Sequence, residues 1–366
     1  MNEHLFSRHF GCRVSDACTY NGLRLVLLEN ELMQVAILPE KGAEIASLRY
    51  KPADVDPLLH FRQGPLHPGP FPVTIPSRDG AFLDVYHGGW QELFPSGGGP
   101  CELAGAELGR HGEVALLPWN WEIVKDEADE IAIHFWVRTL RTPFLLERTL
   151  RLRSGRSVLE IEESVTNEGG VELPFLWGHH PAFGPPFLAE GCRLDTPARF
   201  IEVQQGALDP KNRLIPGSHG VWPEIDGARG ERVDLRYIPH VNEGSADMFY
   251  LTGFQQGWYA LSNPHLGLGV ALAWPTEVFP YLWVWEEFCG SPESPWFGRT
   301  TSLGLEPFNG YSTTSVPALN ESSKLFQQQV LPPGGRLSAW LKAVIFPNPG
   351  NQVVRKVSTD GEILFD

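Results

Sequence analysis

The chain has 366 residues and a formal net charge of −15 at pH 7. Because binding to nucleic acid or to an anionic membrane surface requires clustered Lys and Arg, this acidity argues against both kinds of partner. The sequence contains 38 glycines and 32 prolines from end to end, which favours many short strands joined by turns.

The five cysteines show no C-x-x-C spacing, which argues against a disulfide framework and against a zinc ribbon. The N-terminal residues lack the basic and apolar regions of a signal peptide, and no apolar stretch is long enough to cross a bilayer. We therefore expect a cytoplasmic protein without a membrane partner. A monomer and a homodimer are both compatible with the sequence.

Alternating polar and apolar residues predict antiparallel strands in the first half of the chain, at 23–29, 31–38 and 44–50, within 111–139, at 145–153 and at 157–167. The last two form a predicted hairpin around a Ser-Gly turn, with one charged face and one apolar face. Residues 51–82 are rich in Pro, His and Gly and predict a long loop, followed by a glycine-framed stretch at 84–99.

The most informative stretch, residues 171–187, reads V-E-L-P-F-L-W-G-H-H-P-A-F-G-P-P-F. Residues 175–177 predict a buried strand that delivers His179 and His180 to its end. Pro181 restricts the preceding residue to extended geometry, so His180 is expected to be held rigidly among aromatic residues. A rigid imidazole suits proton transfer near neutral pH, and the alternative is a hydrogen-bonded core histidine.

In the second half, residues 193–245 are expected to be mainly loop, and strands are predicted at 248–251, 258–262, 269–274, 281–285, 301–305 and 338–346. No amphipathic helix longer than three turns and no linker is apparent, which predicts a single all-β domain over residues 1–366. Glu306 directly follows an apolar strand, where a carboxylate is costly to desolvate unless it is paired or functional. The alternative is a solvated strand end.

Four motifs then follow one another in a familiar order: H-G at His111, G-H-H-P-A-F at residues 178–183, D-M-F-Y-L-T-G from Asp247, and L-E-P-F at residues 305–308. From about residue 36 to residue 346, the chain resembles the aldose 1-epimerase, or galactose mutarotase-like, family. The resemblance implies a large antiparallel β-supersandwich around a carbohydrate cleft. It also implies an isomerase that interconverts the α and β anomers of a monosaccharide without metal or cofactor.

The resemblance assigns roles to four residues. Glu306 would be the general base and His180 the general acid, while His111 would hydrogen-bond the sugar near its ring oxygen and Asp247 would hold sugar hydroxyls. Positioned acid and base groups of this kind each accelerate a reaction by about 10²–10⁴-fold. The twelve tryptophans fit two interpretations, as core residues or as walls that stack on the apolar faces of a sugar.

One region departs from the family pattern. Many relatives place an arginine near the glycine-rich turn, whereas this chain offers His87, Trp90 and Gln91 there as expected substrate-binding residues. Arg78 in the preceding S-R-D-G segment is expected either to replace that arginine or to lie on the surface. The departure leaves open a second reading, a non-catalytic carbohydrate-binding or sensing protein on the same fold.

The sequence leaves two further enzyme classes open. A glycoside hydrolase or lyase requires two carboxylates about 5–9.5 Å apart, for which the loose candidates are Glu92, Glu286 and Glu287. A metal-dependent β-barrel enzyme would need His87, His111 and His180 to meet as ligands, and the sequence contains no H-x-H motif. We expect neither a metal nor a cofactor.

Overall fold

The computed structural model describes residues 8, 10–65, 80–206, 211–310 and 329–366. The described chain consists almost entirely of antiparallel strands, which confirms the all-β prediction. Its described helices are the 3₁₀ turn η1 (Lys51–Ala53) and the six-residue α2 (Gly80–Val85). Neither has the length or the hydropathy needed to span a bilayer.

The chain divides into two compact units. Unit 1 comprises Met1–His179 and Thr313–Leu341, and unit 2 comprises His180–Ser312 and Lys342–Asp366. The division falls inside two strands, β13 (Gly178–Phe183) and β25 (Arg336–Pro347). The single-domain interpretation stays a prediction.

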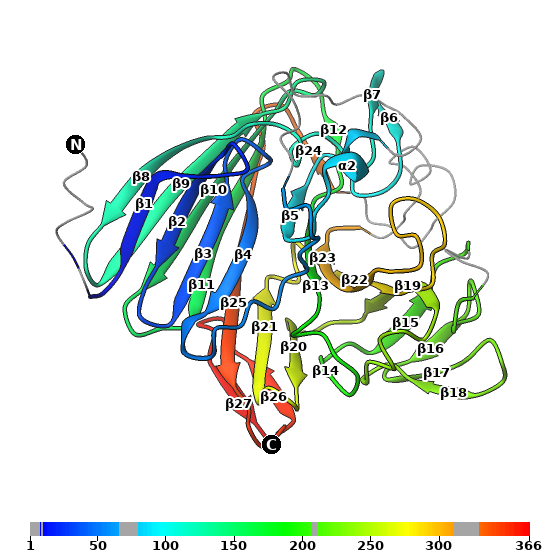
Figure 1. Cartoon of the computed structure of the whole chain (residues 1–366). Coiled ribbons are helices and arrows are strands. Elements are labelled where there is room, and N and C mark those ends of the chain that lie inside the picture. The colour runs from blue at the N-terminus through cyan, green and yellow to red at the C-terminus, as the bar shows by residue number, and fades with distance from the viewer. Residues whose placement is uncertain (1–7, 9, 66–79, 207–210, 311–328) are drawn as a thin grey trace. The chain divides into compact units, whose positions relative to one another are not determined.

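Unit 1 contains two layers of strands, one built from β1 to β5 and the other from β8 to β11 (Figure 1). Its strands are β1 (Arg13–Tyr20), β2 (Leu23–Glu29), β3 (Met33–Leu38), β4 (Glu44–Tyr50), β5 (Trp90–Leu93), β6 (Cys101–Leu103), β7 (Ala106–Leu108), β8 (Asn120–Asp126), β9 (Glu130–Arg138), β10 (Phe144–Arg153), β11 (Val158–Asn167), β12 (Leu173–Pro174) and β24 (Val330–Leu331). Asn30 joins the layers, because its side-chain amide donates to the carbonyls of Arg153 and Arg156 at 2.7 Å each.

The strand pattern of unit 1 follows the sequence closely. The predicted strands at 23–29 and 44–50 are confirmed at both ends as β2 and β4. The strand predicted from residue 31 begins at Met33, because Oδ1 of Asn30 accepts the N–H groups of Leu32 and Met33 and forms a turn there. The predicted hairpin is confirmed as β10 and β11, and β10 alternates strictly between buried and half-buried residues.

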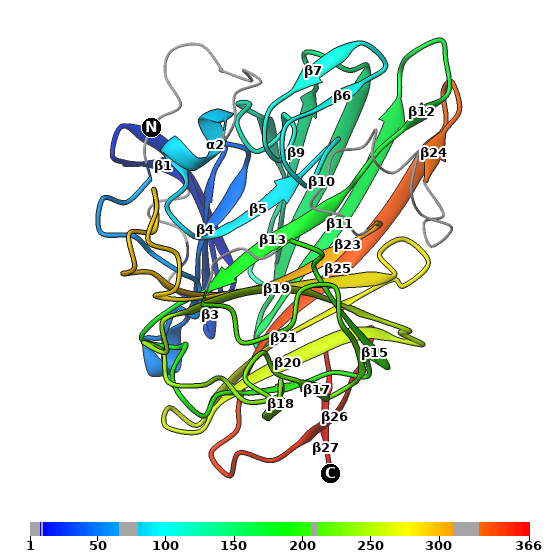
Figure 2. The ribbon, with the colours of Figure 1, turned by 90° about the vertical axis from the view of Figure 1, so that its right-hand side faces the viewer.

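Unit 2 contains a sheet in the order β13-β23-β22-β19-β15-β16-β17-β18, and the adjacent strands β13 and β23 are visible in Figure 2. A second set, β14-β20-β21, continues into residues 342–347 of β25. The strands are β14 (Arg193–Asp195), β15 (Phe200–Val203), β16 (His219–Val221), β17 (Glu224–Asp226), β18 (Arg232–Asp234), β19 (Ser245–Thr252), β20 (Gly257–Asn263), β21 (Leu268–Trp274), β22 (Tyr281–Phe288), β23 (Thr301–Phe308), β26 (Val354–Val357) and β27 (Ile363–Phe365).

Two expectations about the strands are wrong. Residues 175–177 are not a strand, because the N–H groups of Phe175 and Leu176 bond to two separate segments of unit 1, at Gln329 and Pro95. The two histidines therefore lie inside β13 instead of following a strand. Glu306 lies within β23 rather than after its end. By contrast, the described part of residues 193–245 is mainly loop with short strands, as expected, since β14 to β18 have only three or four residues each.

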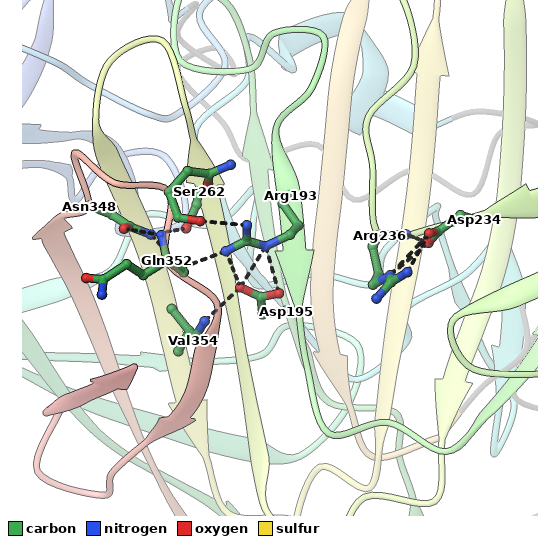
Figure 3. A network of polar contacts seen from close by, with 9 residues as sticks. Arg193, Asp195, Asp234, Arg236, Ser262, Asn348, Gln352 and Val354 are labelled. Carbon is green, nitrogen blue, oxygen red and sulfur yellow. Dashed lines mark hydrogen bonds and ion pairs between the residues drawn. The ribbon is translucent and has the colours of Figure 1, made fainter. Parts of the chain in front are cut away.

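A polar network fixes the C-terminal segment within unit 2 (Figure 3). Arg193 is buried and donates to Asp195 and to the carbonyls of Asn351 and Gln352. Oδ2 of Asp195 in turn accepts the N–H of Val354 at 3.0 Å. These hydrogen bonds satisfy the buried guanidinium of Arg193 and the carboxylate of Asp195 together, and they fix the first residue of β26 beside β14.

Candidate functional site

His180 and Glu306 come together in unit 2. They lie in the neighbouring strands β13 and β23, and Nε2 of His180 is 3.5 Å from Oε1 of Glu306. Only 6% of His180 and 2% of Glu306 is exposed. The imidazole and the carboxylate that the sequence singled out as acid and base are therefore a close, buried pair.

The strand register explains why the two side chains share one face of the sheet. Directly paired residues of antiparallel strands point to the same side. Glu306 pairs with Trp283, and two residues earlier Gly304 pairs with Trp285. The ring of Trp285 packs beside His180, with centroids 6.0 Å apart and planes at 36°. His180, Trp285 and Glu306 therefore line one face together.

Burial shifts the proton affinities of this pair in opposite directions. Removal from water disfavours the charged forms, so it lowers the pKa of His180 to about 4 and raises the pKa of Glu306 well above its ordinary value. Tyr259 is a further neighbour of Glu306. Burial raises the pKa of its phenol, and the negative charge of an ionised Glu306 raises it further. A pair whose members both favour the neutral form holds one transferable proton between its two pKa values.

Asp247 belongs to the same sheet but lies on its other face. It pairs with Glu286, whose side chain alternates with that of Trp285 and so points away from Glu306. The carboxylate of Asp247 accepts the backbone N–H groups of Arg213 and of the residue after it, at 3.1 and 3.0 Å. The sugar-holding role expected for Asp247 stays a prediction.

Arg213, which sequence reasoning did not select, binds two acids on that other face. Its Nη2 lies 2.5 Å from Oε2 of Glu286, and its Nε lies 3.7 Å from Oδ2 of Asp247. Burial raises the pKa of both acids, and the guanidinium opposes that rise. Of the loose hydrolase candidates, Glu286 is thus engaged by Arg213, and Glu287 accepts the N–H groups of a neighbouring loop.

His87 and Gln91 lie in a separate buried cluster of unit 1, together with Lys41 and Glu44. Nζ of Lys41 lies 2.5 Å from Oε2 of Glu44. The same oxygen accepts a hydrogen bond from Nε2 of Gln91 at 2.9 Å. Nδ1 of His87 lies 3.4 Å from the other oxygen of Glu44. Sequence reasoning missed Lys41 and Glu44. The substrate-binding roles of His87 and Gln91 stay predictions.

Trp90 and His179 belong to a polar chain through the core of unit 1. Nε1 of Trp90 donates to Nδ1 of His179 at 3.3 Å, so Nε2 of that imidazole carries the proton donated to Glu163 at 2.9 Å. Arg148 follows, 3.9 Å from Glu163 and 3.5 Å from Glu92. His179 is therefore a hydrogen-bonded core histidine.

His111 lies in a turn of unit 1 with a positive φ of 63°. Its Nδ1 donates to the carbonyl of Gly97 at 2.6 Å, and its ring packs edge-on against Phe82 at 4.5 Å. Arg78 lies outside the described residues. Over the described ranges, no group of three or more His, Cys, Asp or Glu is arranged to hold a metal ion. The sugar contact expected from His111 stays a prediction.

The fold is similar to those of several solved structures. A candidate aldose 1-epimerase from Klebsiella pneumoniae has a TM-score of 0.68 at 16% identity, covering 93% of this chain and 84% of that one. A galactose mutarotase-like protein from Clostridium acetobutylicum has a TM-score of 0.63 at 16% identity, covering 92% and 99%. Another, from Lactobacillus casei, has a TM-score of 0.57 at 19% identity, covering 88% and 100%.

These similarities confirm the predicted β-supersandwich and the resemblance to galactose mutarotase-like proteins. No match was found among the curated proteins. A family model described as "Domain of unknown function (DUF4432)" matches residues 20–322. The chain therefore belongs to the DUF4432 family and has the galactose mutarotase-like fold.

Proposed function

We propose that the chain is an aldose 1-epimerase-like isomerase, which interconverts the α and β anomers of a reducing sugar. The observation that carries the proposal is the buried pair of His180 and Glu306, with 3.5 Å between Nε2 and Oε1. The anomeric hydroxyl oxygen and the ring oxygen are bonded to the same carbon. An acid and a base that act on them together must therefore lie close to each other, as these two groups do.

The proposed reaction opens and recloses the sugar ring. Glu306 takes the proton from the anomeric hydroxyl while His180 gives a proton to the ring oxygen. The bond between the anomeric carbon and the ring oxygen breaks, its electron pair goes to the ring oxygen, and a carbonyl forms. After rotation about the C1–C2 bond the ring closes on the other face, and both protons return.

The proton count of the pair suits this cycle. Before ring opening the proton is on His180, and after it the proton is on Glu306, so the total stays at one. Burial favours the neutral imidazole and the neutral carboxyl group, because it lowers the pKa of one and raises that of the other. The neutral pair is therefore the protonation state that accompanies the open-chain aldehyde, and ring opening begins once the proton of the pair has moved from Glu306 to His180.

Polarimetry tests the proposal directly. The purified protein is added to freshly dissolved α-anomers of a broad panel of aldoses, and the decay of optical rotation is followed against a protein-free control. We expect the protein to accelerate equilibration of at least one sugar. Saturable sugar binding without acceleration would instead support the non-catalytic carbohydrate-binding alternative, and the absence of both would reject the two together.

A further inference from the structure

Two tryptophans on the Glu306 face of the unit 2 sheet have different surroundings. Trp283 is a core residue, since its ring stacks on Phe308 at 4.0 Å and its Nε1 donates to the carbonyl of Gly310 at 2.7 Å. Trp285, two residues along the same strand, is only half-buried and packs beside His180. Trp283 therefore belongs to the packed core, whereas the side chain of Trp285 stays partly exposed to solvent beside the acid–base pair.

A third tryptophan extends this surface. Trp296 is half-buried in the loop that connects β22 to β23, and its ring lies against Trp285 with centroids 5.0 Å apart and planes at 47°. The two indoles form a bent apolar surface, which we call the tryptophan platform. His180 and Glu306 are almost completely buried, so the platform is the part of this group that retains contact with solvent.

The loop that carries Trp296 is held by specific hydrogen bonds. Oε1 of Glu287 accepts the N–H groups of Gly290 and Ser291 at 2.8 and 3.1 Å, and its Oε2 accepts the hydroxyl of Ser291 at 2.5 Å. The N–H of Trp296 donates to the carbonyl of Glu293 at 2.9 Å. Because a fully buried carboxylate anchors the loop, Trp296 is presented beside Trp285 in a defined position.

We propose that the tryptophan platform makes this a site for a reducing sugar with a second ring, of the disaccharide class. This inference rests on the proposed function and names its substrate class. One pyranose ring covers about one indole, and the platform offers two. Rings joined by a glycosidic bond are not coplanar, so two indoles at 47° fit them better than a flat surface would. The reducing ring lies on Trp285 beside the acid–base pair, and the second ring lies on Trp296.

Calorimetry on the Glu306→Gln variant, in which turnover is blocked, separates binding from catalysis. The probes are cellobiose, maltose and lactose, with glucose and galactose as single-ring controls. We expect at least one disaccharide to bind about tenfold more tightly than its single-ring control, a difference of about 1.4 kcal/mol, because its second ring gains contact with the indole of Trp296. Equal affinities for one-ring and two-ring sugars would overturn the inference.

Substitutions in the loop locate the second contact. Trp296→Ala should remove the disaccharide advantage and leave glucose and galactose binding unchanged, and Trp296→Phe should retain part of it. Phe297→Ala is the matched control, because Phe297 is the next residue, is 58% exposed and should not contribute. An equal loss for one-ring and two-ring sugars in Trp296→Ala, or no loss, would contradict the platform. If Trp296→Ala does not fold, the test rests on the affinities of one-ring and two-ring sugars for the protein with Trp296 intact and for Trp296→Phe.

The two proposals fail in different ways. Acceleration of monosaccharide mutarotation without a disaccharide advantage would leave the proposed function intact and reject the platform. Tight, Trp296-dependent disaccharide binding without acceleration of any anomeric exchange would support the platform and reject the proposed function.

Discussion

The carboxylate of Glu306 lies directly over the backbone of Gly304, where a side chain would displace it. A Cβ atom at Gly304 would lie 2.5 Å from Oε1 of Glu306 and 3.3 Å from Cβ of Trp285. Contacts shorter than 3.0 Å are not tolerated by real Cβ atoms, so one group must move. The absence of a side chain two residues before Glu306 is therefore part of what places the carboxylate next to His180.

Gly304→Ala should consequently lower kcat by about 100-fold, because a displacement of about 1 Å from productive geometry can cost that much. The sugar affinity should fall less than kcat, because the added Cβ displaces the carboxylate of Glu306 directly and meets Trp285 only at its Cβ, 3.3 Å away. Gly170→Ala is the control, because an added Cβ there meets no atom within 4 Å. Steady-state mutarotation kinetics check the prediction, and an alanine variant with wild-type kcat would show that the position of this carboxylate does not matter.

The pH dependence of kcat/KM should report the one-proton state of the pair. Below the His180 pKa of about 4 the imidazole gains a second proton, and above the raised pKa of Glu306 the pair loses its only proton. Activity should therefore be highest between these two pKa values and fall on both sides, after correction for buffer-catalysed mutarotation. An acid limb near the ordinary histidine pKa of about 6.5 would contradict a buried, neutral His180.

Arg148 should be a major source of stability in unit 1. The guanidinium is 1% exposed, binds the carbonyl of Ala43, and is the cation between the buried acids Glu92 and Glu163. Arg148→Met leaves those buried carboxylates without the arginine cation and should lower the free energy of unfolding by about 3–5 kcal/mol in urea titrations. The exposed pair of Arg138 and Glu168 provides a comparison, where Arg138→Met should cost less than about 1 kcal/mol. Similar losses in the two variants would refute the prediction.

His87 should make the protein less stable in acid. Burial, helped by the charge of Lys41, lowers its pKa to about 4, whereas an unfolded histidine titrates near 6.5. The unfolded state thus binds more protons between these values, so stability falls as the pH falls through this window, by at most about 3 kcal/mol from this group. His87→Gln should reduce that loss in thermal unfolding, whereas the exposed control His219→Gln should not. Identical pH dependence in the wild type and His87→Gln would contradict the prediction.

The sequence predicted those parts of the fold that local patterns determine. Alternation of polar and apolar residues predicts the hairpin of β10 and β11. In the structure β10 alternates between buried and half-buried residues, whereas β11 is buried at most positions on both faces. The apolar run at residues 175–177 was misread as a strand, since burial alone does not distinguish a strand from a segment whose N–H groups bond to separate partners. Motifs single out His180 and Glu306, whose burial and separation only the structure provides.

Other features depended on register and on distant partners. The face of Asp247 is set by its pairing with Glu286, which no local pattern encodes. The cluster of Lys41 and Glu44 gains its meaning from Gln91, 47 residues from Glu44. Trp296 carries no signal of its own in the sequence, because its place beside Trp285 depends on hydrogen bonds that hold the loop around it.

The central claim is that His180 and Glu306 together transfer the protons that open a sugar ring. The most direct measurement is anomer exchange by NMR on the best substrate, with wild type, Glu306→Gln and His180→Gln compared with the exposed control Glu293→Gln. We predict that each of the first two substitutions lowers the catalysed exchange rate by about 10²–10⁴-fold while thermal unfolding stays cooperative, and that Glu293→Gln matches the wild type. Wild-type exchange in folded Glu306→Gln would contradict the account.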